Sequence, residues 1–164
     1  MPELEAVGAE FASSAAHIVK VERIIDATRH DIWDVITETA TWTAWFPTMS
    51  RAESVNQRAT LGSTRTVKVG LLVAEEQIVV ADEPARWGFT VVRTNLPIAT
   101  QMLELLDLED VGSPERPRTR VIYTGAFAPT WFTRPLFRLT KRSVATTWRH
   151  GLDGLATHLA GSGQ

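Results

Sequence analysis

The sequence predicts an α+β fold in which one curved antiparallel sheet of seven strands is covered by a long C-terminal helix. Apolar residues within 131–159 recur at steps of three, four and seven, which places them on one face of an α-helix. They are Phe137, Val144, Trp148, Leu152, Leu155 and Leu159. Residues 16–127 instead mostly alternate between apolar and polar side chains, as half-buried strands do. Because a helical stripe of this length needs a broad apolar surface to cover, we expect the sheet to supply it.

The first strand and two short helices are expected at the start of the domain. In residues 17–25 apolar and charged residues alternate, so that one strand face is mainly apolar. Asp26 and Thr28 can each cap the first short helix, because their side-chain oxygens accept hydrogen bonds from free backbone N–H groups. Pro47 is expected to end the second short helix, since proline lacks a backbone N–H.

Six further strands precede the long helix in the predicted order. We expect them at residues 49–56, 62–69, 72–81, 87–93, 100–108 and 118–127. Their short connections are rich in Gly, Pro, Asn and Asp, which favours an antiparallel meander. Strand alternation predicts that Trp87, Phe89 and Val91 share one face. By the same rule, Ile78 and Val80 are expected on one face.

The chain length is that of a single domain. A chain of 164 residues can bury roughly 70% of its unfolded surface without help from disulfides or metals. Residues 1–15 are small, acidic and aperiodic, so we expect a flexible lead-in or a loose helical turn there rather than part of the core. We assign residues 16–160 to the domain and residues 161–164 to a C-terminal tail. The oligomeric state stays open.

The composition excludes several classes of protein. The chain has no cysteine, which rules out thiol nucleophiles, disulfides and thiolate zinc sites. A net charge of −2 and a pI near 6.1 give no reason to expect a nucleic-acid partner. No stretch approaches the roughly 20 apolar residues of a membrane span, and the first residues lack the pattern of a secretion signal. We therefore expect a soluble, cytoplasmic protein without stable membrane insertion.

The histidines and the glycines match no common site for a metal or a cofactor. His150 and His158 are eight residues apart on the predicted helix, whereas metal-binding helices usually place two histidines three or four residues apart. The sequence has no Gly-x-Ser-x-Gly elbow, no phosphate-binding Gly-rich loop and no dinucleotide fingerprint. We expect no metal site and no cofactor.

The apolar face of the long helix is interrupted. Thr140, Thr147 and Gly151 lie close to the apolar positions and present small or hydroxyl-bearing surface where a tightly packed core would carry Leu or Phe. A long helix on a curved sheet need not fill the space between them. The sequence therefore predicts a pocket for a small molecule between the helix and the sheet.

Short motifs in a fixed order along the chain resemble one group of proteins. They are Ile25-Asp26-Ala27 with Ile32-Trp33, Trp42 with Trp45-Phe46-Pro47, Gly62-Ser63-Thr64-Arg65, Glu75-Glu76-Gln77-Ile78 before Asp82-Glu83-Pro84, and Thr119-Arg120-Val121. With these motifs, residues 17–159 resemble the SRPBCC superfamily, which includes START-type lipid-transfer domains, polyketide cyclases and plant pollen-allergen proteins. Within it, the chain is most similar to the polyketide cyclase/dehydrase-like grouping.

This resemblance implies a helix-grip fold, in which a seven-stranded antiparallel sheet surrounds the C-terminal helix. It also implies a cavity between them that opens near the short helices and the strand-connecting loops. Members bind sterols, lipids, polyketides, plant hormones or flavonoids, and some are cyclases, dehydratases or hydrolases. Since one fold serves so many chemistries, the resemblance implies no particular reaction.

The candidate ligand-binding residues lie on the predicted inner faces of the sheet and the helix. They are Trp87, Phe89, Met102, Val121, Tyr123, Phe137, Thr140, Val144 and Trp148. Trp87 and Trp148 are singled out because an indole offers a flat apolar wall with one hydrogen-bond donor. Packing within the core is the alternative for both. We expect Trp33, Trp42 and Trp45 mainly to hold the short helices against the sheet edge, and secondarily to line the cavity entrance.

Tyr123, Arg65 and Glu104 are the candidate catalytic residues. Tyr123 is two residues from Val121 and is expected to point inward, where its hydroxyl needs a partner. An inward Arg65 could join it in holding a carboxylate, enolate or carbonyl oxygen, but we expect Arg65 to face solvent. Glu76 and Glu104 could serve as general bases, although a solvated carboxylate is the expected state of each.

Three functional hypotheses follow from these features. The leading one is binding of a small hydrophobic or amphipathic molecule (lipid-like, polyketide-like or aromatic) in the cavity. The second is a cofactor-free cyclase, aromatase or dehydratase that acts in the same cavity. The third is a lipid carrier that touches membranes through a basic helix face, for which an ordinary solvated face is the alternative. That face carries Arg134, Arg138, Lys141, Arg142 and Arg149.

Overall fold

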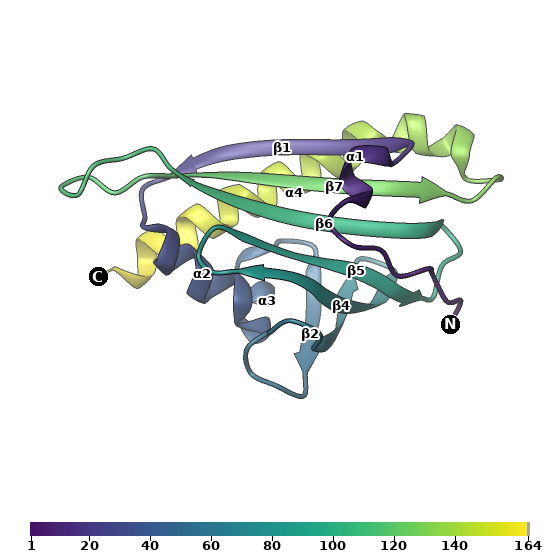
Figure 1. Cartoon of the computed structure of the whole chain (residues 1–164), viewed down its shortest axis with the longest axis horizontal. Helices are drawn as coiled ribbons and strands as arrows, with labels where there is room; N and C mark the ends of the chain where they lie inside the picture. Colours follow the sequence, from purple (N-terminus) through teal and green to yellow (C-terminus); the bar gives the residue numbers. More distant parts are fainter. Residues whose placement is uncertain (164) are drawn as a thin grey trace.

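All seven strands form one antiparallel sheet, in the spatial order β1-β7-β6-β5-β4-β3-β2 (Figure 1). The structure is a computed structural model and describes residues 1–163. The strands are β1 (His17–Ile25), β2 (Met49–Ser54), β3 (Thr64–Val69), β4 (Leu72–Asp82), β5 (Arg86–Thr94), β6 (Ala99–Asp110) and β7 (Thr119–Pro129). Strands β2 to β7 follow one another as a meander, and β1 pairs with β7 at the far edge. The predicted α+β fold class is confirmed.

The helices lie where the sequence places them, with small shifts at their ends. They are α1 (Phe11–Ser14), α2 (Arg29–Thr37), the 3₁₀ turn η1 (Thr39–Thr41), α3 (Trp42–Trp45) and α4 (Arg134–Ser162). Thr28 caps α2 through a reciprocal capping box with Asp31. None of the helices among residues 1–163 combines the length and the apolar content that crossing a membrane requires.

Helix α4 begins and ends three residues later than the predicted 131–159. A turn in which the Thr133 N–H bonds to the Thr130 carbonyl precedes it, and Pro135 occupies its first turn, where a missing N–H costs nothing. At the other end α4 continues to Ser162, so that residues 161 and 162 of the expected tail are helical. The end of that tail, residue 164, lies outside the described residues.

One face of the sheet carries the main core and faces α4. On β5, Trp87, Phe89 and Val91 are all buried in this core, as the alternation predicts. The expectation for β4 was wrong, because a register irregularity between Ile78 and Val80 shifts the alternation by one residue. Ile78 therefore belongs to the inner core and Val80 to a separate cluster on the outer face.

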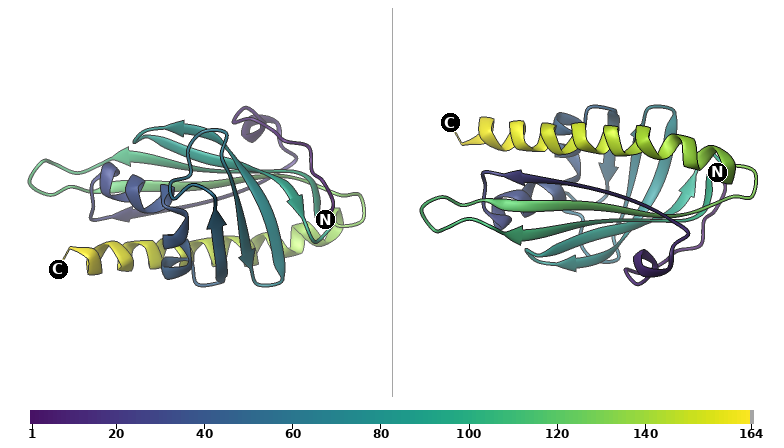
Figure 2. Two further views of the ribbon diagram at one scale, coloured as in Figure 1. Left: turned by 90° about the horizontal axis from the view of Figure 1, so that it is seen from below. Right: turned by 90° about the horizontal axis from the view of Figure 1, so that it is seen from above.

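The N-terminal segment covers the outer face, on the side of the sheet opposite α4 (Figure 2). Residues 1–15 were expected to be a lead-in apart from the core. In the structure the Leu4 N–H bonds to the Val92 carbonyl at 2.9 Å, and Leu4 is buried. Outer residues Leu103 and Leu105 of β6 pack against this segment, among others through Phe11 of α1. Both faces of the central strands are thus covered.

Glycines let α4 approach the short helices closely. A Cβ atom on Gly154 would collide with the backbone oxygen of Trp45, and one on Gly151 would lie 2.7 Å from the Phe46 ring. The interruption at Gly151 therefore serves helix packing, whereas the sequence reading placed it at a pocket. This contact fixes the C-terminal half of α4 and leaves its N-terminal half to cover the open side of the sheet.

We predict that Gly154→Ala destabilises the protein by about 1–3 kcal/mol, since the added methyl group meets backbone that cannot rotate away. Denaturant unfolding at neutral pH measures the change. Gly161→Ala in the same helix is the matched control, because a Cβ there meets nothing within 4 Å. It should stabilise the helix by up to about 1 kcal/mol. Equal effects of the two substitutions would contradict the packing argument.

Candidate functional site

A pocket of about 270 Å³ lies between the inner face of the sheet and the N-terminal half of α4. Strands β3 to β7 form its floor and walls, and α4 covers it. Most of its lining is aliphatic or aromatic, with Val67, Ala74, Phe89, Met102 and Phe127 as buried examples. Ligand pockets share this character, an apolar cavity with a few polar groups.

The opening of the pocket lies beside α4 and the strand connections. Lining residues that keep exposed surface include Leu72 after the β3–β4 turn, Ile98 before β6, and Phe137, Ser143, Val144 and Thr147 on α4. Trp42 of α3 and Phe46 also line the pocket, but both are buried. The loops thus frame the opening, as the resemblance implies, and the short helices close the inner end.

A buried ion pair joins two neighbouring strands inside the pocket. Arg65 on β3 and Glu76 on β4 are direct register partners, and both side chains point inward. The Arg65 Nε donates a hydrogen bond to Glu76 Oε2 at 2.6 Å, with the Arg65 side chain fully buried. The expectation that Arg65 faces solvent was therefore wrong. Arg65 precedes Val67 and Val69 at steps of two, so it shares their buried face.

Three aromatic rings surround the Arg65 guanidinium. Its central carbon lies 4.2 Å from the ring centroid of Trp42, 4.9 Å from that of Trp87 and 4.8 Å from that of Phe89. Such contacts stabilise a desolvated cation through the negative faces of the rings. Neither Nη1 nor Nη2 of Arg65 has a hydrogen-bond partner among residues 1–163. The buried guanidinium therefore still has N–H groups with which to hold an oxygen atom.

A second polar pair lies across the pocket floor on β6 and β7. The Tyr123 hydroxyl donates a hydrogen bond to Glu104 Oε2. The Tyr123 ring stacks on the Trp148 indole of α4, with centroids 4.3 Å apart and planes 24° from parallel. Trp148 reaches this position because the neighbouring β7 residue is Gly125, where a Cβ atom would collide with the indole. The Tyr123 ring thus lies between the sheet that carries it and the Trp148 indole of α4.

Burial sets the protonation of the two carboxyl groups. Burial raises the pKa of Glu104 to about 8, and the negative charge of Glu76 adds to this rise, while the Tyr123 hydrogen bond and Arg65 oppose it. Burial also raises the pKa of Glu76, against the charge and the hydrogen bond of Arg65. The pKa of Tyr123 is raised as well, by burial first and then by Glu104. At neutral pH Glu104 is thus mostly a neutral acid.

The structure brings most of the predicted ligand-binding residues together. Phe89, Met102, Tyr123, Phe137, Val144 and Trp148 line the pocket. Trp87, Val121 and Thr140 lie outside its lining: Trp87 and Val121 are fully buried in the core, and the Thr140 hydroxyl bonds to the Phe137 carbonyl. Ligand contact by the six lining residues stays a prediction.

The candidate catalytic residues Tyr123, Arg65 and Glu104 all line the same pocket. Glu104 was expected to be solvated, but its side chain faces the cavity and bonds to Tyr123. Sequence reasoning assigned Trp42 mainly to helix packing and secondarily to the cavity entrance, and it missed the contact of Trp42 with Arg65. Its Nε1 does bond to the Ile36 carbonyl at 2.7 Å, and its ring also covers Arg65. No pattern in the sequence links Trp42 to a distant arginine.

Among the described residues, no group of three or more His, Asp and Glu side chains lies close enough to hold a metal ion. The ionisable groups of the pocket are instead one guanidinium, two carboxyl groups and one phenol, and Ser143 and Thr147 add hydroxyl groups. Together they can bind oxygen atoms and transfer protons.

Solved structures of low sequence identity share this architecture. A protein from Thermus thermophilus is 16% identical with a TM-score of 0.75, over 90% of this chain and 100% of that one. A protein described as a START superfamily protein from Mycobacterium smegmatis is 12% identical with a TM-score of 0.72, over 88% and 98%. One from Thermobifida fusca is 20% identical with a TM-score of 0.66, over 87% and 92%. No curated protein matches the sequence.

The fold, with a long helix closing a pocket on a curved sheet, is the helix-grip fold that the sequence motifs imply, and the START superfamily protein from Mycobacterium smegmatis shares it. Residues 16–160 match the family described as polyketide cyclase/dehydrase and lipid transport. The chain belongs to this family, as the sequence motifs indicate.

We predict that the stability of the protein falls as pH rises from 4.5, the ordinary pKa of a Glu side chain, to about 8, its value at Glu104. In this window the folded protein keeps a proton on Glu104 that the unfolded chain releases, so the free energy of unfolding falls by up to about 1.4 kcal/mol per pH unit. Below 4.5 both states are protonated and this dependence disappears. Thermal unfolding across the pH range measures it.

Glu104→Gln should flatten this part of the profile, because the amide does not titrate. Glu22→Gln, on the exposed face of β1, is the matched control and should leave the profile unchanged. A Glu104→Gln profile as steep as that of the unaltered protein would show that Glu104 is ionised in the folded state.

Proposed function

We propose that this protein binds a small amphipathic molecule in the pocket between the sheet and α4. The observation that carries this proposal is an apolar cavity with a buried guanidinium whose Nη1 and Nη2 have no hydrogen-bond partner among residues 1–163. Membership of a family described by polyketide cyclisation and lipid transport supports a hydrophobic ligand.

The size of the cavity favours a small ligand. Its volume of about 270 Å³ lies just below the usual range for ligand pockets, which is roughly 300–1,000 Å³. An aromatic molecule of one or two rings, or a short chain, fits this volume better than a membrane lipid with two acyl chains. The aromatic residues Phe89, Phe127 and Trp148 offer ring faces to such a ligand.

The polar end of the ligand is expected to carry an oxygen acceptor. The guanidinium of Arg65 offers N–H donors that the protein leaves free, and a carboxylate, carbonyl or hydroxyl oxygen accepts from them. The Glu104 carboxyl group lines the same pocket as Arg65. Because its raised pKa of about 8 keeps it neutral near pH 7, it repels an anionic ligand less than a carboxylate would. An apolar body with one oxygen-bearing end therefore matches both parts of the pocket.

We predict that 2-naphthoic acid quenches or shifts the tryptophan fluorescence on binding, and that Val144→Phe weakens this binding at least tenfold by filling the cavity. Thr146→Phe is the matched control, because Thr146 lies on the exposed side of the same helix. Isothermal calorimetry supplies the stoichiometry. Equal affinities of the two variants would place the binding outside the pocket.

The paired variant Arg65→Met with Glu76→Leu tests the polar end in the same assay. Removing both charges of a buried pair together is often neutral for stability, whereas removing one leaves an unpaired buried charge. The double variant should bind 2-naphthoic acid no better than naphthalene. A retained preference for the acid would mean that Arg65 does not hold the oxygen.

A second candidate function is proton transfer to a bound carbonyl compound, as in enolisation or dehydration. The observation that favours it is the Glu104 carboxyl, which is protonated near neutral pH and bonded to Tyr123 inside the pocket. An acid with a pKa near the working pH is well suited to donate a proton to an oxygen. As water removes the proton from the activated carbon, negative charge develops on the carbonyl oxygen. Arg65 would stabilise this charge and Glu104 would donate its proton to the oxygen, which gives the enol.

For this second function we predict that the protein accelerates hydrogen–deuterium exchange at the activated carbon of a bound aromatic β-diketone, followed by NMR. Glu104→Gln should slow the exchange by a factor of about 10²–10⁴ while binding persists. The rate should fall as pH rises through about 8, where Glu104 loses its proton. Binding without any acceleration would remove this function and leave the first one intact.

A further inference from the structure

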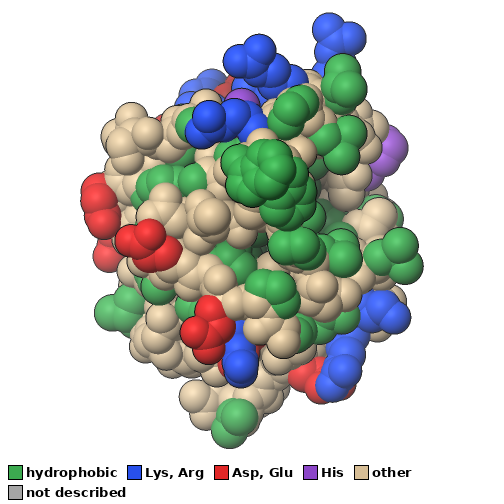
Figure 3. Space-filling view, turned by 90° about the vertical axis from the view of Figure 1, so that its right-hand side faces the viewer, with side chains coloured by type: hydrophobic (Ala, Val, Ile, Leu, Met, Phe, Trp, Pro, Cys, Tyr) green, Lys and Arg blue, Asp and Glu red, His purple; other side chains and the backbone are tan. Residues whose placement is uncertain are grey.

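Four large apolar side chains are exposed close together where α4 begins. Trp131 is 85% exposed, Phe132 50%, Leu136 57% and Leu139 78%. The rings of Trp131 and Phe132 meet edge to face, 5.6 Å apart. Figure 3 shows hydrophobic side chains gathered on this end of the molecule, with Lys and Arg side chains along one edge. A single exposed Leu is ordinary, but a contiguous group of this kind marks an interaction surface.

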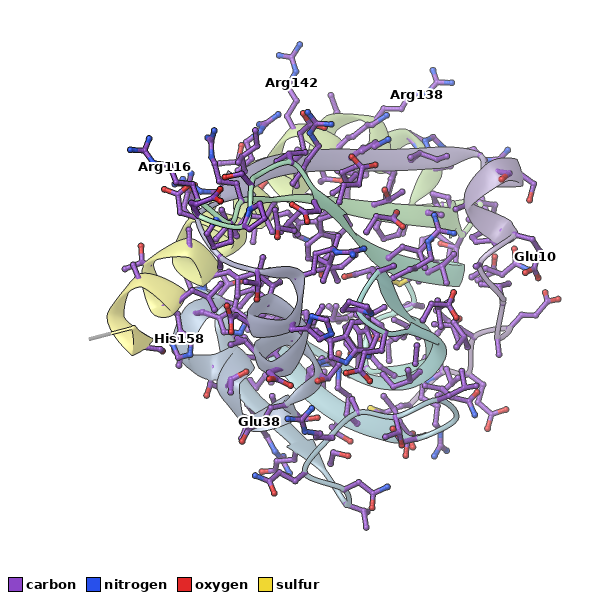
Figure 4. All side chains as sticks on the ribbon, turned by 60° about the vertical axis from the view of Figure 1, so that its left-hand side comes forward. Glu10, Glu38, Arg116, Arg138, Arg142 and His158 are labelled. Atoms are coloured by element: carbon purple, nitrogen blue, oxygen red, sulfur yellow. The ribbon has the colours of Figure 1, made fainter. Side chains whose placement is uncertain are left out.

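Positively charged side chains of α4 lie beside these four apolar side chains. Residues 130–152 contain no Asp or Glu, although the whole chain has a net charge of −2. The first turns of α4 carry Arg134, Arg138, Lys141 and Arg142, all exposed. None of them belongs to the ion pairs found among residues 1–163. Figure 4 shows Arg138 and Arg142 projecting outward from α4.

The positive charges of α4 also act on His17 of the neighbouring strand β1. Partial burial lowers the pKa of His17 on β1, and the charges of Arg138, Arg134 and Lys141 lower it further. His17 also packs on the Phe137 ring of α4 at 5.1 Å, so it lies directly beside these cations. The surface therefore attracts an anion rather than a cation.

The exposed apolar strip runs toward the opening of the pocket. Leu136, Leu139 and Ser143 are spaced by three and four residues, so they lie along one side of α4. Ser143 is itself part of the pocket lining. A surface bound to Leu136 and Leu139 would thus lie next to the opening.

We propose that this surface, defined by Trp131, Phe132, Leu136 and Leu139 with the four cations, docks on an anionic lipid bilayer. The two parts of the surface match the two parts of a bilayer interface: aromatic and aliphatic side chains enter the apolar layer, and arginine and lysine contact the anionic headgroups. Docking turns the pocket opening toward the membrane, where a small amphipathic molecule dissolves. This property belongs to the outer surface and is independent of what the pocket holds.

Co-sedimentation with vesicles tests the proposal on the full chain. The protein should bind vesicles of phosphatidylcholine with phosphatidylserine at low salt, and bind pure phosphatidylcholine at least tenfold more weakly. Arg138→Glu with Arg142→Glu should weaken binding at least about twentyfold, since each cation strengthens binding to an anionic surface by roughly fivefold. Trp131→Ser with Leu139→Ser should weaken it at least tenfold. All four side chains are exposed, so these changes leave the core intact.

Matched controls lie elsewhere on the surface. Arg116→Glu changes the charge on the β6–β7 hairpin, at the opposite end of the molecule from the start of α4 in Figure 1, and Val55→Ser removes an aliphatic side chain that is fully exposed between β2 and β3. Each should bind vesicles within twofold of the unaltered protein. Absence of binding to anionic vesicles at low salt overturns the proposal and leaves an acidic protein as the partner to seek. Equal losses in controls and in the α4 variants also overturn it, because the charge of the whole protein would then be responsible.

Discussion

The buried charge of Arg65 is the constraint on which the inner face of the sheet depends. A guanidinium cannot release its proton, so its burial requires a counter-charge and polarisable neighbours. Glu76 supplies the charge from the adjacent strand at 2.6 Å, and the rings of Trp42, Trp87 and Phe89 supply the neighbours. Since Trp42 belongs to α3, the arginine also ties the short helices to the sheet. The packing at the inner end of the pocket is therefore organised around one cation.

The two polar pairs divide the pocket into unlike halves. Arg65 and Glu76 form a charged pair in which both partners are held by the fold. Glu104 and Tyr123 form a pair that is neutral near pH 7, because burial and the nearby Glu76 raise the pKa of Glu104. One half thus offers fixed electrostatic attraction and the other offers an exchangeable proton. An apolar ligand with a single oxygen atom could therefore contact both the Arg65–Glu76 pair and the Glu104–Tyr123 pair in this one pocket.

Periodicity predicted the fold and the inner faces of the strands and the long helix, because both depend on which residues share a face. Phe89, Met102, Phe137 and Trp148, which it placed on these faces, line the pocket. It failed at Val80, where an irregular strand pair shifts the alternation, and at Arg65, whose direction on its strand was left uncertain and which was expected to face solvent. The contact of Trp42 with Arg65 was out of reach, since it joins elements whose relative placement only the folded chain defines.

The N-terminal segment gives the outer face of the sheet an apolar contact of its own. Val80, Leu103, Leu105 and Ala126 are buried there without any contribution from the pocket. Strands β4, β6 and β7 are thereby held from behind, so the opposite face does not need complete packing to keep its shape. Residues that line the cavity can consequently diverge between related proteins, and ligand preference can change, while the scaffold that presents them is preserved.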